Sequence, residues 1–114
     1  MGTNILKDSM DKLIYNVTVN IDHSVHDEWL QWMKETHIPE VMATGCFLES
    51  RFSKIVSDDE QGGVTYSVQY LLANEKDFDL YQNDFAPKLQ QEHASKYAGK
   101  FAAFRTMLSM VAQF

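Results

Sequence analysis

One histidine stands where a helical pattern meets a proline, in the stretch ETHIPEVMATGCF (residues 35–47). An imidazole titrates near neutral pH, so His37 could serve as a catalytic acid, a base or a hydrogen-bond donor. Glu40 follows three residues later, close enough to orient the ring. The alternative is structural, because a histidine at a helix end can cap free carbonyl groups and interacts favourably with the helix dipole. The sequence leaves both roles open.

A second histidine, His93, lies on the apolar stripe of a later helical pattern, between Leu89 and Tyr97. It could contact a ligand there, or it could be a hydrogen-bonded residue of the core or of an interface. His23 and His26 are three residues apart, but no cysteine cluster stands beside them, so we expect no metal site. The sequence contains no phosphate loop or dinucleotide fingerprint, and we expect no bound cofactor.

Polar side chains that alternate with apolar ones along predicted strands form a third group. We expect them to share one face of a sheet, where they would either bind a small polar or aromatic molecule or pack against a second copy of the chain. These residues are Asn16, Thr18, Asn20, Arg51 and Gln69. Glu49 is two residues from Arg51 on the same face, and we expect a local ion pair. Cys46 is interpreted as a small apolar strand residue rather than a nucleophile.

The composition limits the class of protein. A length of 114 residues favours one domain, which we place at residues 13–114 after a leader of residues 1–12. The net charge is −6, and binding to phosphates needs a concentrated basic surface, so we expect neither nucleic acid nor an anionic membrane as a partner. No apolar run approaches the roughly 20 residues that span a bilayer. The single cysteine and the absence of a signal-peptide pattern favour the cytoplasm.

Alternating apolar residues predict strands, and apolar residues at spacings of three and four predict helices. The predicted strands are residues 13–21, 46–56, 64–72 and 100–114, with a polar turn at 57–63. One helix should begin at Ser24, with Asp27 at capping-box spacing, and end near His37, since a residue before a proline avoids the helical region. Pro39 can then start another short turn, which Gly45 closes. A second helical stretch, residues 74–97, should begin at the N-cap Asn74, divide at Pro87 and end with Gly99 as the C-cap.

The order β-α-β-β-α-β predicts an α+β, ferredoxin-like fold, in which two helices cover one face of a four-stranded antiparallel sheet. The face toward the helices is predicted to hold Tyr15, Val17, Val19, Ile21, Leu48, Phe52, Val64, Tyr66, Val68 and Tyr70. The opposite face is predicted to hold the five polar residues above, with Phe47, Glu49, Thr65 and Ser67. The last strand is apolar in both phases, so the side on which Arg105 lies stays open.

Three stretches carry a resemblance to a known superfamily: YNVTVNID, W-x-x-W-x-x-x-x-H-I-P-E-V-M-A-T-G-C-F, and F-A-P-K-L followed by F-A-A-F-R-T-M-L. Over residues 14–114 the chain resembles the dimeric α/β-barrel superfamily of ferredoxin-like proteins, and more closely a small bacterial family filed as a domain of unknown function. The resemblance implies a homodimer whose two sheets face each other, with a pocket between each sheet and its helices. Superfamily relatives include cofactor-independent monooxygenases, lactone isomerases, haem-degrading enzymes and binding proteins, so the fold does not fix the function.

The sequence thus predicts a small homodimer that binds or acts on a small hydrophobic or aromatic molecule in a sheet–helix pocket. His37 would be the proton-transfer group, with Asn16 and Asn20 positioning the substrate. One alternative is a structural or interaction dimer without a ligand. A weaker one is a cofactor-independent monooxygenase or a haem-degrading enzyme. The haem-degrading relatives combine a first-strand asparagine and a helical histidine with a tryptophan in the third-strand region, whereas both tryptophans of this chain fall in the first helix.

Overall fold

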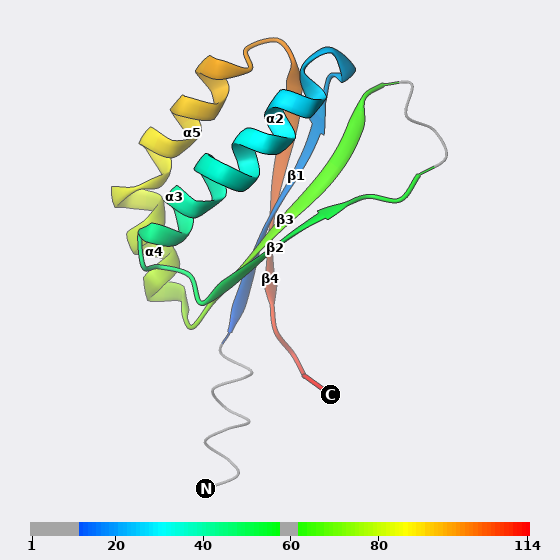
Figure 1. Cartoon of the computed structure of the whole chain (residues 1–114). Helices are drawn as coiled ribbons and strands as arrows, with labels where there is room; N and C mark the ends of the chain where they lie inside the picture. Colours follow the sequence, from blue (N-terminus) through cyan, green and yellow to red (C-terminus); the bar gives the residue numbers. More distant parts are fainter. Residues whose placement is uncertain (1–11, 58–61) are drawn as a thin grey trace, which may run out of the picture.

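The computed structural model describes residues 12–57 and 62–114 of the chain. They form a four-stranded antiparallel sheet with strand order β2-β3-β1-β4 (Figure 1). The strands are β1 (Leu13–Ile21), β2 (Glu49–Lys54), β3 (Val64–Leu72) and β4 (Phe101–Ser109). This arrangement confirms the predicted ferredoxin-like α+β fold, with β1 and β3 at the centre. The predicted leader falls outside the described residues except for Lys12, as does most of the predicted turn at 57–63.

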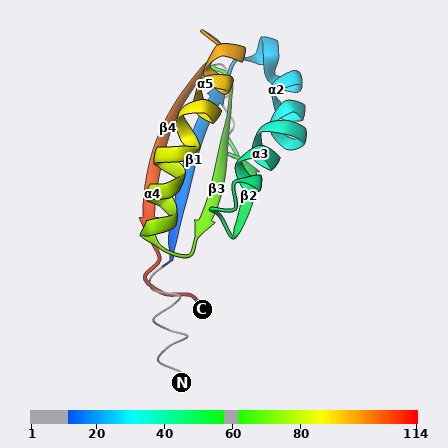
Figure 2. The same cartoon turned by 90° about the vertical axis from the view of Figure 1, so that its left-hand side faces the viewer.

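The helices all lie on one face of the sheet, as predicted. They are α2 (His26–Trp32), α3 (Ile38–Ala43), α4 (Glu75–Asp84) and α5 (Ala86–Lys96). In Figure 2, α4 and α5 lie over the side of β1 and β4, and α2 and α3 lie on the side of β2 and β3. The core between helices and sheet is rich in aromatic rings, among them Tyr15, Trp29, Phe47, Tyr66, Tyr70, Tyr81 and Tyr97. None of the helices in the described part of the chain is long and apolar enough to cross a bilayer.

The first helical segment begins differently from the prediction. Ser24 does not cap a helix with Asp27. Instead the carboxylate of Asp22 accepts hydrogen bonds from the backbone N–H of Ser24 (2.8 Å) and from its hydroxyl (2.6 Å). Asp22 thereby caps a short 3₁₀ turn, η1 (His23–Val25), which leads into α2. An aspartate can serve this role as well as a serine can, so the sequence offered two competing caps.

A new helix, α3, begins with Pro39 in its first turn, as predicted, but the expected break near His37 is absent. The chain passes from α2 through a π turn, η2 (Met33–His37), straight into α3, and Ile38 has helical angles (φ −64°, ψ −43°) although Pro39 follows it. The N–H of Ile38 reaches five residues back to the carbonyl of Met33. A π turn widens the backbone just where a proline ring would otherwise crowd the preceding turn. The hydrogen-bond spacing therefore changes locally from four residues to five, and the helical path continues to Ala43.

The second helical stretch follows the prediction more closely. The side chain of Asn74 caps α4 by accepting a hydrogen bond from the N–H of Asp77 (2.9 Å). The stretch divides at Phe85, two residues before Pro87, and α5 begins there. Its C-cap is Tyr97 rather than the predicted Gly99, which instead takes a left-handed conformation (φ 75°) in the turn that leads to β4.

The predicted second strand is too long at both ends, and its first residues face the opposite way. Phe47 is buried, 6% exposed, whereas Leu48 is 56% exposed. Residues 46–48 precede the regular strand, so the two-residue alternation does not yet apply to them. Phe47 turns inward to pack on Tyr81 and Tyr70, with ring centroids 4.7 and 4.9 Å away. From Glu49 onward the predicted alternation holds.

Gly63 gives a direct test of the turn that positions β3. It has φ of 112°, and a Cβ atom there would lie 2.5 Å from the carbonyl oxygen of Ile21 and 2.6 Å from Oδ1 of Asn20. We expect Gly63→Ala to lower the free energy of unfolding by about 1–3 kcal/mol, through backbone strain and this close contact. Urea denaturation measures the change. Gly62→Ala is the matched control, because a Cβ atom there meets nothing within 4 Å; equal losses in the two variants would contradict the explanation.

Candidate functional site

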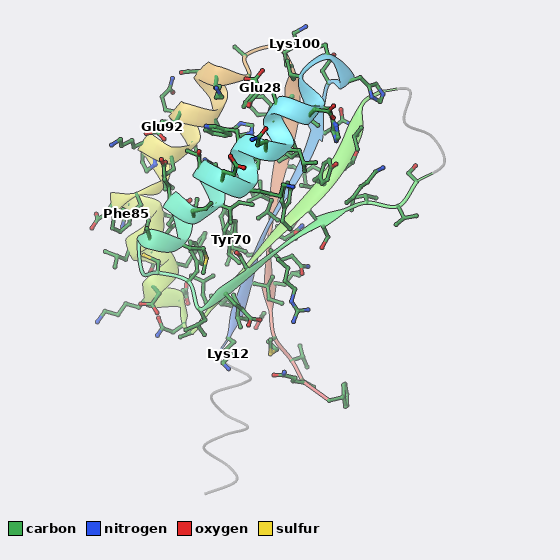
Figure 3. All side chains as sticks on the ribbon, viewed as in Figure 1. Lys12, Glu28, Tyr70, Phe85, Glu92 and Lys100 are labelled. Carbon is green, nitrogen blue, oxygen red and sulfur yellow. The ribbon has the colours of Figure 1, made fainter. Side chains whose placement is uncertain are left out.

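A cavity of about 400 Å³ lies between the sheet and the helices. Its walls come from β1, β3 and β4 on the sheet side and from η2, α3, α4 and α5 on the other. Tyr70 marks this space in Figure 3, between the helices and the sheet. Both predicted histidines, His37 and His93, line the cavity. The described structure therefore brings together the two imidazoles that the sequence placed on separate helices.

His37 lies at the junction of η2 and α3, with its ring stacked on Trp32 (centroids 5.0 Å apart, 24° between planes). It is the N-cap residue of α3, and its side chain makes no capping hydrogen bond there. Its Nδ1 atom is buried and has no hydrogen-bond partner among the described residues. Burial lowers the pKa of His37 to about 4, and the nearby Glu92 carboxylate on α5 only partly opposes this shift. His37 is therefore neutral at pH 7.

His93 is more deeply buried, 8% exposed, and its ring centroid lies 5.7 Å from that of His37. The indole N–H of Trp29 donates a hydrogen bond to Nε2 of His93 (2.9 Å). An indole can only donate, so Nε2 carries a lone pair and the neutral ring holds its proton on Nδ1. Burial lowers the pKa of His93 to about 4, with smaller contributions from His37 and Arg105. The prediction of a hydrogen-bonded core histidine is thus correct, although His93 also reaches the cavity.

The register of β4 decides the position of Arg105, which the sequence left open. Arg105 pairs with Val17 of β1, and Ala103 pairs with Val19. Directly opposed residues of an antiparallel pair point to the same face, so Arg105 lies on the helix side of the sheet. It lines the cavity, and its own side chain stays exposed to solvent.

Three tyrosines from β1, β3 and α4 also line the cavity: Tyr15, Tyr70 and Tyr81. Burial raises the pKa of each phenol, so all of them keep their hydroxyl hydrogen at neutral pH. For Tyr15, interactions with Arg105 and with Gln90 of α5 partly oppose this rise in pKa. The cavity wall thus combines aromatic surface with neutral hydrogen-bonding groups and one guanidinium.

The predicted polar group lies on the other side of the sheet. Its residues pair across the central strands, Asn16 with Gln69 and Gln69 with Arg51, on the face that carries no helix. Much of this group is already hydrogen-bonded within its own face. Asn16 donates to Thr18 (3.2 Å) and accepts from Ser67, and Asn20 donates to Thr65 (3.0 Å).

The thickness of the sheet separates Asn16 and Asn20 from His37, so one chain does not form the predicted site that combined them. The expected ion pair between Arg51 and Glu49 is present at 4.0 Å, in an exposed position. Across the described ranges, no three His, Cys, Asp or Glu side chains are grouped so that they could hold a metal ion.

Several cavity residues were missed because their types gave a misleading signal. Tyr15 and Tyr70 were predicted in the core, and they are buried, as is Tyr81 of α4, but all three also line the cavity. The face of the sheet on which Arg105 lies could not be predicted, because apolar residues occur on both faces of its strand. A register between β1 and β4 would have placed it, since Phe101, Ala103 and Arg105 alternate opposite Ile21, Val19 and Val17.

The comparison with protein families gives a match over most of the chain. The family model described as Domain of unknown function (DUF4286) matches residues 12–111. The chain belongs to this family. No curated protein matches the chain.

Solved structures share the fold of this DUF4286 chain at low sequence identity. SnoaB, a cofactor-independent oxygenase from Streptomyces nogalater, is 12% identical, with a TM-score of 0.59 over 90% of this chain and 96% of that one. A dimeric ferredoxin-like protein from an uncultured marine organism is 11% identical, with a TM-score of 0.62 over 90% and 98%. A proposed antibiotic biosynthesis monooxygenase from Caulobacter crescentus CB15 is 17% identical, with a TM-score of 0.64 over 97% and 98%. At these identities the likeness establishes the fold alone.

The two lowered histidine pKa values make the stability of the DUF4286 domain depend on pH. Between about pH 6.5 and 4 the unfolded chain protonates these rings while the folded chain does not, so acidification favours unfolding. Each histidine should lower the free energy of unfolding by up to about 1.4 kcal/mol per pH unit in that window. We expect His37→Gln to lose less stability than the wild type between pH 7 and pH 5, as measured by urea denaturation.

His93→Gln should behave in the same way, because its amide oxygen can still accept the hydrogen bond from Trp29. An unchanged pH dependence in both variants would show that neither histidine is held neutral by burial.

Proposed function

We propose that this protein binds a small aromatic or otherwise apolar molecule in the cavity between its helices and its sheet. The observation that carries the proposal is the cavity itself. Its volume of about 400 Å³ is within the range of known ligand sites, and its walls combine aromatic and aliphatic side chains with hydrogen-bonding groups. A close-packed core does not leave such a volume unfilled.

His37 is the residue we propose for proton transfer in the cavity. It lines the cavity and is neutral at pH 7, so its ring is in the state that accepts a proton from a bound molecule. We propose Tyr70, Tyr81 and Arg105 for the positioning role first expected of Asn16 and Asn20, because they share the cavity with His37.

An oxygenase activity is the second candidate. A neutral histidine beside a bound aromatic molecule could accept a proton from it, and a structure of the same fold is named a cofactor-independent oxygenase. Haem degradation has less support. Nε2 of His93, a natural metal ligand, already accepts the hydrogen bond of Trp29, and both tryptophans lie in α2.

We also propose that two copies associate through the open face of the sheet. This face carries exposed apolar residues on β4, with Phe104 63% and Leu108 42% exposed. The five predicted polar residues lie beside them and would be interface residues rather than ligand contacts. The marine structure is named a dimeric ferredoxin-like protein, which supports the association of two copies.

A ligand screen, combined with a substitution that fills the cavity, tests the proposed ligand binding. A thermal-shift screen of quinones, flavins, haem and aromatic acids should find compounds that stabilise the wild type, by about 2.7 kcal/mol at a concentration of 100 times Kd. We expect Ala94→Phe, which projects into the cavity from α5, to abolish the shift. Ala98→Phe is the matched control at an exposed position beyond the helix and should keep it.

His37→Ala belongs in the same screen, because it removes the proposed proton-transfer group without filling the cavity. For any compound that binds, oxygen consumption by the wild type and by His37→Ala tests the oxygenase candidate. A wild type that no compound stabilises would contradict the binding proposal.

A charged substitution on the open face tests whether this face is the dimer interface. Sedimentation should give the wild type a mass of twice the 13.1 kDa chain at micromolar concentration. Phe104→Glu buries an uncompensated carboxylate in the interface and should weaken the dimer by about tenfold or more. Leu80→Glu, at an exposed site on α4 (46%), is the control and should leave the mass unchanged. A wild type that sediments as a monomer would exclude this interface.

A further inference from the structure

The charges around the cavity are unbalanced. Among the described residues that line it, Arg105 is the only one with a full charge at neutral pH. The two histidines are neutral, and the phenols keep their protons. The protein as a whole is acidic, with a net charge of −6. Arg105 is therefore an isolated positive charge at an aromatic cavity, in a chain whose net charge is negative. Its surroundings indicate which kind of ligand this charge would bind.

No carboxylate of the described residues lies within ion-pair distance of Arg105. The chain has one other arginine, Arg51, and it pairs with Glu49 at 4.0 Å on the opposite face. Glu92 lies near the cavity but acts on His37. The guanidinium of Arg105 thus keeps donor groups available for an acceptor that enters the cavity.

The neighbours of Arg105 favour a negatively charged acceptor. Tyr15 and Arg105 line the cavity together, and the guanidinium is close enough to oppose the rise in the pKa of the Tyr15 phenol that burial causes. The phenol keeps its hydrogen at neutral pH and can donate it to an acceptor beside the guanidinium. The positive charge also acts on Tyr81 and His93 across the cavity, because it favours the phenolate of Tyr81 and disfavours the imidazolium of His93. A guanidinium and a phenol side by side make a typical site for a carboxylate or an ionised phenol.

We infer that the ligand of this cavity is an aromatic monoacid, whose acidic group is bound by Arg105 and Tyr15 at the mouth while its apolar body lies deeper, against Val17, Val68 and Met33. The inference rests on the proposed function, since it names the chemical class that the cavity selects. It also explains why Arg105 remains exposed: the acidic group stays at the solvent-accessible end, where its desolvation costs least. The deep end holds neutral groups only.

A pair of probes of equal shape tests the inference: 2-naphthoate, which is charged, and 2-naphthamide, which is neutral. Titration calorimetry at pH 7.5 should show that the wild type binds 2-naphthoate about tenfold or more tightly than 2-naphthamide. Arg105→Gln should remove this preference by weakening the acid alone. Arg105→Lys keeps the charge and should keep part of the preference, which separates recognition of the charge from a damaged fold. Arg51→Gln is the matched control on the opposite face and should bind both probes as the wild type does.

The outcomes separate this inference from the proposed function. If the wild type binds both probes equally and Ala94→Phe loses both, acid recognition is overturned and the proposed ligand cavity stands. If Arg105→Gln and Arg51→Gln weaken 2-naphthoate to the same extent, the effect comes from overall charge and the inference is also overturned. If the wild type binds neither probe, the inference is overturned, and the thermal-shift screen decides the proposed function separately. A loss of 2-naphthoate binding confined to Arg105→Gln, with a smaller loss in Tyr15→Phe, supports the site as described.

Discussion

The register of β1 is the constraint on which the rest of the molecule depends. This central strand pairs with β3 on one side and with β4 on the other, residue for residue along its whole length. Because successive side chains of a strand point to opposite faces, that register sorts the sheet into a helix-covered side and an open side. A slip of one residue in β4 would move Arg105 out of the cavity and bring Phe104 into it. The chemistry of both faces is therefore fixed by backbone pairing before any side chain packs.

Burial determines which side chains are charged on the helix-covered side of the sheet. Low polarity keeps phenols protonated and imidazoles neutral, so the groups in the cavity act as hydrogen-bonding dipoles rather than as charges. The guanidinium of Arg105 keeps its charge at the solvent-exposed mouth. The result is a gradient from a charged entrance to a neutral interior. Such a gradient would orient the proposed ligand with its acidic group at the entrance.

The bounds of secondary-structure elements were predicted best where a single hydrophobic periodicity runs along the element. Strands β1 and β3 were predicted at their observed bounds, because apolar and polar residues alternate along them without interruption. The errors fell where two local rules competed. Asp22 and Ser24 are both good caps, and the rule that a proline ends a helix gave way to a π turn that keeps the helical path intact.

Other features depend on contacts that a linear pattern does not contain. The inward turn of Phe47 depends on tyrosines from β3 and α4, more than 20 residues away along the chain. The position of Arg105 depends on pairing with β1, which is far from it in sequence. For the same reason His37 and His93 were identified singly, and their meeting in one cavity could be seen only in three dimensions.

The contacts of the two indoles have a practical consequence. The chain contains two tryptophans, and each touches a cavity histidine: Trp29 through its hydrogen bond to His93, and Trp32 through its stack on His37. The tryptophan fluorescence of this protein therefore originates beside the two cavity histidines. We expect the tryptophan emission to change when either imidazole is protonated or when the proposed ligand binds, so the unmodified chain carries its own optical probe for that proposal.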